Sequence, residues 1–299
     1  MAKYEIIDGV AILPEGIEMI EDEAFKNCKE LKRVVIPQWV RRIGDDAFWG
    51  CENLEVVELP EWLEVIGKNA FEHCSSLKEL NLPQWVKRIE RCAFWGFKSL
   101  QNLSIPSSVT HIRNGAFSYC SSLVRIKVDS NNPVYDSRED CNAIIHTESN
   151  TLIRGCSNTI IPPSVTSIEY GAFSGCTSLT QISLPPSVTS IGKEAFKGCS
   201  SLEYVEIPQS VTKIGDEVFK GCTSLPVIDN VRYADTYLIG AVDTLKSTYK
   251  IKKAVATMID DSTQTIELAN YKVDENIPAS VFVFDNKLVP QGTPVIDLR

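Results

Sequence analysis

The sequence predicts a solenoid, mainly of β-structure, in which one coil of the chain takes 23 residues. Proline returns at this spacing, and after a gap of 56 residues it resumes, at Pro14, Pro37, Pro60, Pro83, Pro106, Pro162, Pro185 and Pro208. Phenylalanine keeps the same spacing at Phe25, Phe48, Phe71, Phe94, Phe117, Phe173, Phe196 and Phe219. Leucine does so at Leu31, Leu54, Leu77, Leu100, Leu123, Leu179, Leu202 and Leu225. Three residue types in one register indicate stacked units, each covering the apolar side of its neighbour.

Each repeat reads as extended chain and turns. In one repeat, the apolar residues Leu54, Val57 and Leu59 give a strand-like pattern, and Pro60 ends the strand because it has no N–H to donate. A second extended segment at 63–66 and a corner containing Ala70 and Phe71 complete the coil. No segment has the ten or more amphipathic residues of a helix. We therefore expect one strand on a main sheet, a short second strand opposite it, and little helix.

The chain divides into three parts. Residues 1–22 hold two apolar runs joined by Asp8-Gly9, which predicts a β-hairpin that caps the end of the array. The array itself spans residues 23–225, with a stretched coil at about 129–161 whose apolar runs Ala143–Ile145 and Leu152–Ile153 suggest a protruding hairpin. We interpret residues 226–299 as a degenerate repeat and a C-terminal β cap, with an independent domain as the alternative.

Four segments of the C-terminal part carry this interpretation. Asp235–Gly240 and Tyr249–Ile251 echo the stretched coil, and Thr265–Leu268 and Val281–Phe284 read as strands. Turn residues follow at 274–276 and 285–286.

Composition narrows the classes of function. A net charge of -9 and a pI near 5.0 argue against a general nucleic-acid binder, which needs a basic surface. No apolar run approaches the length of a membrane span, so we expect no membrane insertion. The first residues have no secretory signal, because Lys3, Glu5 and Asp8 interrupt their apolar character. An intracellular protein and one whose leader lies outside this sequence both fit.

The ten cysteines suggest a buried column rather than disulfides or a metal site. Seven share one repeat position: Cys28, Cys51, Cys74, Cys120, Cys176, Cys199 and Cys222. Phe97 occupies the equivalent position in another coil, so the position is apolar and faces inward. Parallel side chains rarely meet the angular requirements of a disulfide. No CxxC motif occurs, and we expect free thiols and neither metal nor cofactor.

The units 161–179 and 184–202, I-P-P-S-V-T-S-I-E-Y-G-A-F-S-G-C-T-S-L and L-P-P-S-V-T-S-I-G-K-E-A-F-K-G-C-S-S-L, resemble the BspA-like leucine-rich repeat family of bacterial surface proteins. The resemblance covers about residues 14–225. It implies a right-handed curved coil stack with a parallel sheet on its concave face. It also implies adhesion or protein binding at a cell surface, or after secretion.

The tryptophans are the candidate binding residues. Trp39, Trp62 and Trp85 share the second position after the proline, where other coils carry glycine or serine. Trp49 and Trp95 follow the phenylalanine of alternate coils. Both positions accept small or charged residues and should touch solvent, which predicts an exposed aromatic ladder with rungs about 5 Å apart. In the alternative interpretation, the indoles stack to shelter the sheet edge, helped by the stems of basic residues: Arg41, Arg42, Lys87 and Arg88.

Other surfaces give weaker signals. The outward positions of the main sheet are charged in the early coils and polar in later ones, so this sheet is a second candidate for a partner. The acidic loop with Asp129, Asp136, Glu139 and Asp140 fits no EF-hand spacing and reads as turn residues. His73 and His111 are expected at the surface. Cys141 and His146 could be a nucleophile and base, but five residues apart on one strand they face opposite ways.

The sequence therefore predicts a non-catalytic module that binds a protein partner, of host or bacterial origin, through the concave sheet or the tryptophan-lined rim. The alternative is glycan binding through Trp39, Trp62 and Trp85. A hydrolase that depends on Cys141 is the third hypothesis, although no glycine-rich phosphate loop, HExxH or GxSxG motif occurs.

Overall fold

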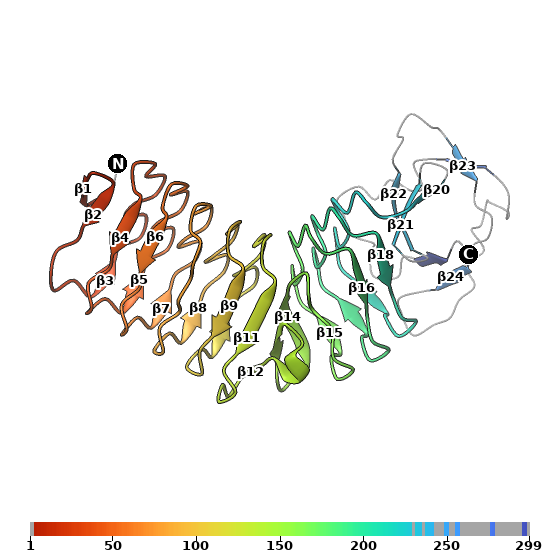
Figure 1. The fold of residues 1–299 in the computed structure, drawn as a ribbon. Coiled ribbons are helices and arrows are strands. Elements are labelled where there is room, and N and C mark those ends of the chain that lie inside the picture. Colours follow the sequence, from red (N-terminus) through yellow and green to blue (C-terminus); the bar gives the residue numbers. More distant parts are fainter. Residues whose placement is uncertain are drawn as a thin grey trace.

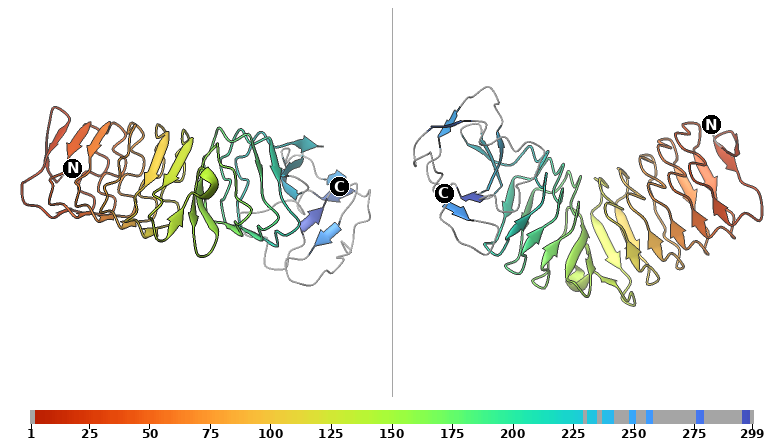
Figure 2. Two further views of the ribbon diagram at one scale, coloured as in Figure 1. Left: turned by 60° about the horizontal axis from the view of Figure 1, so that its bottom comes forward. Right: turned by 180° about the vertical axis from the view of Figure 1, so that it is seen from behind.

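A computed structural model describes residues 3–228 together with 231–234, 237–241, 248–250, 255–257, 276–278 and 295–297. The coils stack side by side along a curved array, with the N-terminus at one end (Figures 1 and 2). The described residues are mainly β and contain one 3-10 turn, η1 (Arg138–Asp140). The fold is thus the predicted β-solenoid, and its coils place strands in two rows.

The long-strand row holds the strand that precedes the proline of each repeat. β2 (Val10–Ile12), β4 (Arg33–Val35) and β6 (Val56–Glu58) pair in parallel, one coil apart. β9 (Asn102–Ile105) pairs in the same way with β11 (Arg125–Val128), as does β16 (Gln181–Ser183) with β18 (Tyr204–Glu206). Inward and outward side chains alternate, because the period of a strand is two.

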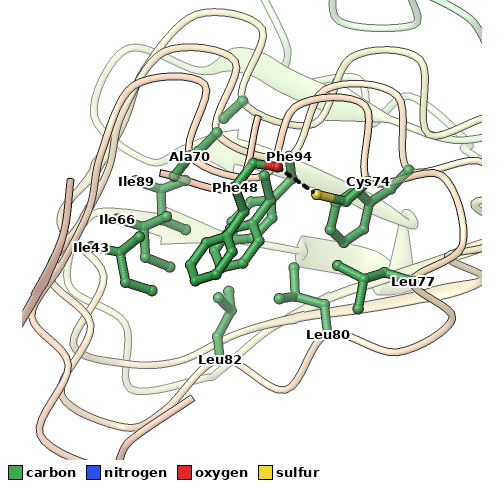
Figure 3. Close-up of a cluster of buried hydrophobic side chains, with 14 of the residues drawn as sticks. Ile43, Phe48, Ile66, Ala70, Cys74, Leu77, Leu80, Leu82, Ile89 and Phe94 are labelled. Atoms are coloured by element: carbon green, nitrogen blue, oxygen red, sulfur yellow. Dashed lines mark hydrogen bonds between the residues drawn. The ribbon is translucent and has the colours of Figure 1, made fainter. Parts of the chain in front are cut away.

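The short-strand row follows the proline turn. It begins with β3 (Met19–Ile20), β5 (Arg42–Ile43), β7 (Val65–Ile66), β8 (Arg88–Ile89) and β10 (His111–Ile112). After the stretched coil it continues with β15 (Ser167–Ile168), β17 (Ser190–Ile191) and β19 (Lys213–Ile214). Equivalent residues lie in register, so the buried isoleucines form a column (Figure 3).

At the N-terminal end, β1 (Glu5–Ile7) and β2 form an antiparallel hairpin. Asp8 and Gly9 turn the chain with φ of 51° and 83°, the left-handed region in which aspartate and glycine are tolerated. Because β2 pairs with β4, the hairpin covers the first coil of the long-strand row. Tyr4 lies against the ring of Phe25, at 5.5 Å between centroids.

The corner after each short strand carries the phenylalanine column. Rings of consecutive coils stack nearly parallel, with centroids 5.0 Å apart for Phe48 and Phe71 and 5.6 Å apart for Phe71 and Phe94 (Figure 3). Corner amides donate to the next coil, as Phe48 N–H does to Ala70 O at 2.8 Å. The thiols are free and mostly buried, as predicted. Six cysteines of the repeat column, from Cys51 to Cys222, each donate to a carbonyl of the preceding coil, as Cys74 Sγ does to Phe48 O at 3.1 Å.

The stretched coil interrupts this scheme. β12 (Tyr135–Asp136), β13 (Ala143–His146) and β14 (Thr151–Gly155) run antiparallel, and β14 then pairs in parallel with β15. The sequence suggests a hairpin that protrudes, but Ala143, Ile144 and Ile145 are fully buried. Ile144 packs in the core of the preceding coils, whereas its two neighbours pack in the core of the following coils. β13 is therefore a partition between two hydrophobic cores.

Beyond Leu225 the structure describes short strands: β20 (Val227–Ile228), β21 (Val231–Ala234), β22 (Tyr237–Ala241), β23 (Thr248–Lys250), β24 (Val255–Thr257), β25 (Asn276–Pro278) and β26 (Val295–Asp297). β20, β21 and β22 form an antiparallel meander. The strands expected at 265–268 and 281–284, and the turn at 285–286, lie outside the described residues. Whether residues 226–299 form a cap or a separate domain stays a prediction.

Candidate interaction surfaces

Trp39, Trp62 and Trp85 lie in the tight turns that join the long-strand row to the short-strand row. In each turn the proline carbonyl accepts a hydrogen bond from the valine or leucine three residues on, at 3.1–3.2 Å. The tryptophan directly precedes the valine or leucine that donates this hydrogen bond, and its side chain points outward. The three side chains are 65, 40 and 45% exposed, and the rings of Trp62 and Trp85 stack with centroids 5.2 Å apart. We call these three residues the rim ladder.

Serine at the same position has a structural role in other coils. The hydroxyls of Ser108, Ser187 and Ser210 donate to the carbonyl of the valine in the preceding turn, at 2.7, 2.6 and 2.7 Å. Tryptophan cannot make this bond to a carbonyl with its ring turned to solvent. The backbone therefore does not require tryptophan here, and serine would satisfy it better.

Charged residues run beside the rim ladder. Glu64 bridges Arg41 and Lys87 of the neighbouring coils, at 2.9 and 2.8 Å between nitrogen and oxygen. The candidate residues Arg42 and Arg88 lie on β5 and β8, two coils apart, with Val65 between them in the register. Their guanidinium groups are paired with Asp45 at 3.2 Å and Glu90 at 2.7 Å, so carboxylates already compensate the positive charge of both.

Trp49 and Trp95 form a separate group, because they lie at the corner beyond the short strands. His73 packs between them, with centroid distances of 6.0 Å to Trp49 and 4.6 Å to Trp95, and Trp95 contacts Tyr119 at 4.6 Å. We call these four residues the corner strip. The sequence predicts both His73 and His111 at the surface, but it does not indicate that His73 packs between two tryptophans, and it does not mark Tyr119.

A glycine pattern could have revealed the corner strip. The position that holds His73 and Tyr119 is glycine in coils before, between and after them, at Gly50, Gly96, Gly175, Gly198 and Gly221. A Cβ added at Gly175 would lie 2.8 Å from the Tyr119 ring. A large side chain at this corner therefore needs glycine at the same position of the neighbouring coil, so that it can pack on the backbone there.

The long-strand row has the exposed face expected of it. Its outward side chains include an ion pair between Arg33 and Glu58, and three apolar residues that are about half exposed: Val35, Val56 and Tyr204. Among the described residues, the exposed face of this row has no cluster of one residue type comparable to the tryptophans of the rim ladder.

The stretched coil does not assemble a nucleophile and base. Burial raises the pKa of the Cys141 thiol to about 11, so the thiol stays protonated at neutral pH. His146 Nδ1 instead lies 2.9 Å from Ser149 Oγ. In the acidic loop, Asp136 is paired with Arg138 at 2.6 Å, and Asp129 accepts the amide of Asn131, as turn residues do. Within the described part of the chain, no three histidine, cysteine or acidic side chains group as metal ligands.

These features define a parallel β-solenoid of leucine-rich coils with aromatic strips on its surface. The chain belongs to the family described as the BspA type leucine rich repeat region, whose profile matches six copies over residues 10–137 and 151–260. The unmatched residues between these ranges lie in the stretched coil. A comparison with curated protein sequences found no match.

Solved structures agree with this class. A leucine rich cell surface protein from Faecalibacterium prausnitzii is 29% identical, with a TM-score of 0.50 over 76% of this chain and 74% of that one. The pneumococcal vaccine antigen PcpA is 23% identical, with a TM-score of 0.62 over 73% of this chain and 61% of its own. A leucine-rich repeat protein from Eubacterium ventriosum is 24% identical, with a TM-score of 0.56 over 73% and 65%. The chain thus spans less than two thirds of the latter two.

None of the helical structure in the described residues has the length and apolar character of a membrane-spanning helix.

Proposed function

We propose that this chain is a non-catalytic adhesion module of a bacterial surface protein, and that it binds a protein partner through the rim ladder. Repeat proteins of this kind bind partners on extended surfaces built from equivalent positions in successive coils. The similar F. prausnitzii protein is described as a cell surface protein, which supports a surface location here.

One observation carries the proposal: tryptophan stands at a position where serine satisfies the backbone in other coils. Exposed tryptophan is costly to keep on a soluble surface, and it is among the residues that dominate binding energy at protein interfaces. The Arg41–Glu64–Lys87 ion pairs beside the ladder provide the polar rim that usually surrounds such aromatic anchors. Stacking of Trp62 on Trp85 fixes their rings and lowers the entropy that a partner must remove.

The experiment compares two sets of substitutions on one fold. In the rim variant, Trp39, Trp62 and Trp85 are replaced by serine, which is the residue of other coils and leaves the backbone scheme intact. In the matched control, Trp49 and Trp95 of the corner strip are replaced by serine. Both proteins are tested against immobilised extracellular-matrix and cell-surface proteins, together with the unchanged chain.

We expect the rim variant to lose at least tenfold in affinity for a bound partner, because hot-spot truncations cost about 2 kcal/mol or more. The corner variant should retain its affinity. Equal binding by the rim variant and the unchanged chain would refute a role for the ladder.

Glycan binding is the second candidate, because the Trp62–Trp85 stack presents flat aromatic faces on which sugar rings can lie. A polysaccharide array with the same variants separates the two functions. Loss of sugar binding in the rim variant would favour the glycan, whereas protein binding without any sugar response favours adhesion to a protein.

A further inference from the structure

The stretched coil leaves a cavity of about 240 Å³ between the corner of one coil, at residues 113–118, and the corner of the next, at 169–171. Its other lining residues come from β12 and from the hairpin of β13 and β14, among them Tyr135, His146, Thr151 and Arg154. The volume lies below the roughly 300–1,000 Å³ of pockets for drug-sized ligands, so it suits a small molecule.

Two of the backbone hydrogen bonds that normally join neighbouring corners are missing across this cavity. In an ordinary corner, three amides donate to the next coil, as those of Asp46, Phe48 and Gly50 do at 2.8 Å each. At the gap the equivalent amides are those of Gly115, Phe117 and Tyr119, and only the third makes its bond, to Ser174 O at 2.9 Å. The amides of Gly115 and Phe117 have no hydrogen-bond partner among the residues that the structure describes.

The stretched coil has taken the acceptor that the Phe117 amide would use. Gly155 N–H donates to Ala172 O at 2.9 Å, and this carbonyl is the equivalent of the one that Phe117 would bind. Arg154 Nη1 donates to the carbonyls of Gly171, Ala172 and Ser174 at 3.1–3.3 Å. The cavity is therefore left with hydrogen-bond donors in excess, which water or a ligand with acceptor atoms can satisfy.

Arg154 also supplies a charge that this part of the protein does not neutralise. It is 3% exposed, its Nε is buried without a hydrogen-bond partner, and it forms no ion pair with the described residues. Leaving a buried cation without an anion is costly. Carbonyl groups and the Cys176 sulfur satisfy its other nitrogens but carry no full negative charge.

The charges that line the cavity select a monoanion. Arg113, Arg154 and Glu169 line it, but Arg113 Nε also lies 3.9 Å from Glu90, whereas Arg154 has no carboxylate within ion-pair distance among the described residues. One carboxylate balances this one unpaired cation, and a phosphate dianion exceeds it. The Tyr135 hydroxyl accepts the amide of Ile112 at 2.9 Å and can still donate to a ligand, whereas the hydroxyls of Ser149 and Thr151 already hydrogen-bond to each other at 2.9 Å.

We propose that this cavity is a binding site for a small hydroxylated carboxylate of the hexuronic acid class. The carboxylate lies against Arg154 and the free amides of Gly115 and Phe117, and the Tyr135 hydroxyl donates to a ligand hydroxyl. The site is separate from the rim ladder and does not depend on its function.

Binding can be measured by calorimetry and ligand-observed NMR with glucuronate, at constant ionic strength, with glucose and inorganic phosphate as comparison ligands. Arg154 also holds backbone carbonyls, so substitutions are made at the partly exposed residues instead. We expect saturable binding of glucuronate alone, tightened about fivefold by Glu169→Gln and weakened about fivefold by Arg113→Gln, since each changes one unit charge near the carboxylate. Lys127→Gln, at an exposed site on β11, is the matched control and should leave affinity unchanged.

Three results would overturn the assignment. The first is no saturable binding of glucuronate by either the unchanged chain or Glu169→Gln, which would mean that the cavity holds only water. The second is binding of phosphate or glucose as tight as that of glucuronate. The third is equal weakening by Arg113→Gln and Lys127→Gln, which would reduce the effect to general surface charge.

Discussion

Replacing Phe71 by alanine should destabilise the first half of the array and leave the second half nearly unchanged. Phe71 is fully buried, and its ring stacks on Phe48 at 5.0 Å and on Phe94 at 5.6 Å, with interplanar angles of 6° and 5°. The substitution leaves a cavity between two rings that the stacked backbone holds in place. Because the neighbouring coils cannot collapse into it, we expect the upper part of the usual range for phenylalanine-to-alanine changes, about 3–5 kcal/mol.

The column of phenylalanine rings is interrupted at the stretched coil, and this limits the loss of stability to the first half of the array. Stacked rings continue from Phe25 to Phe117 and again from Phe173 to Phe219, and β13 separates the two cores. In a solenoid, stability is approximately a sum of terms for each coil and its nearest neighbours. A cavity at Phe71 therefore weakens the coils before the stretched coil far more than those after it.

Urea denaturation followed by hydrogen exchange, resolved by peptide, tests both parts of this prediction. Phe196→Ala is the matched change in the second column, since its ring stacks on Phe173 at 5.0 Å and on Phe219 at 5.4 Å. Each variant should accelerate exchange in its own half. A loss below about 1 kcal/mol for Phe71→Ala, or equal acceleration in both halves, would refute the stacked-column reasoning.

Three further outcomes follow from the same contacts. Gly155→Ala should destabilise the second half by about 1–3 kcal/mol in denaturant titrations, because the new Cβ would lie 2.2 Å from the Phe173 ring; an unchanged midpoint would contradict this. Burial raises the pKa of Cys51 and Cys120 from 9.0 to about 12. The contribution of each protonated thiol to the free energy of unfolding is therefore complete below pH 9 and is lost as the pH rises toward 12, with a loss of about 1.4 kcal/mol per thiol at pH 10. Unfolding measured from pH 8 to 10.5 checks this, and Cys51→Ala should flatten the profile by one thiol. Trp62→Ser should change stability by less than about 1 kcal/mol, since the hydrogen bond of the new hydroxyl to the preceding carbonyl offsets the loss of the surface contact with Trp85; a larger loss would make the ladder structural.

The sequence was sufficient to predict the interior of the array. A position filled by phenylalanine or leucine in coil after coil has to face a core, because each coil exposes the same apolar side to its neighbour. The buried cysteine column followed from Phe97, since a position that accepts both residues is apolar. The exposure of Trp62 and Trp85 followed in the same way, from the serine that replaces them in other coils.

Two features escaped this reasoning because the repeat does not encode them. The corner strip depends on which coil carries glycine beside His73 or Tyr119, so it is a relation between neighbouring coils and not a property of one position. The cavity depends on which carbonyl each amide reaches across the stretched coil. Arg154 occurs once in a segment without a repeat partner, and no pattern in the sequence marks it as buried.

The rim ladder and the cavity nevertheless have one physical origin. In an ordinary coil the backbone scheme satisfies the three corner amides that face the next coil, and serine at the rim adds a bond that the fold can use but does not need. That position can therefore carry tryptophan in three coils with little loss of stability, and it is available for a partner. At the stretched coil the opposite holds: Gly155 and Arg154 donate to the Ala172 carbonyl that Phe117 would use, and the amides of Gly115 and Phe117 and the charge of Arg154 have no partner among the described residues. We therefore expect binding surfaces in this solenoid where the repeat's hydrogen-bond requirement is either absent or unmet, with a different class of ligand at each kind.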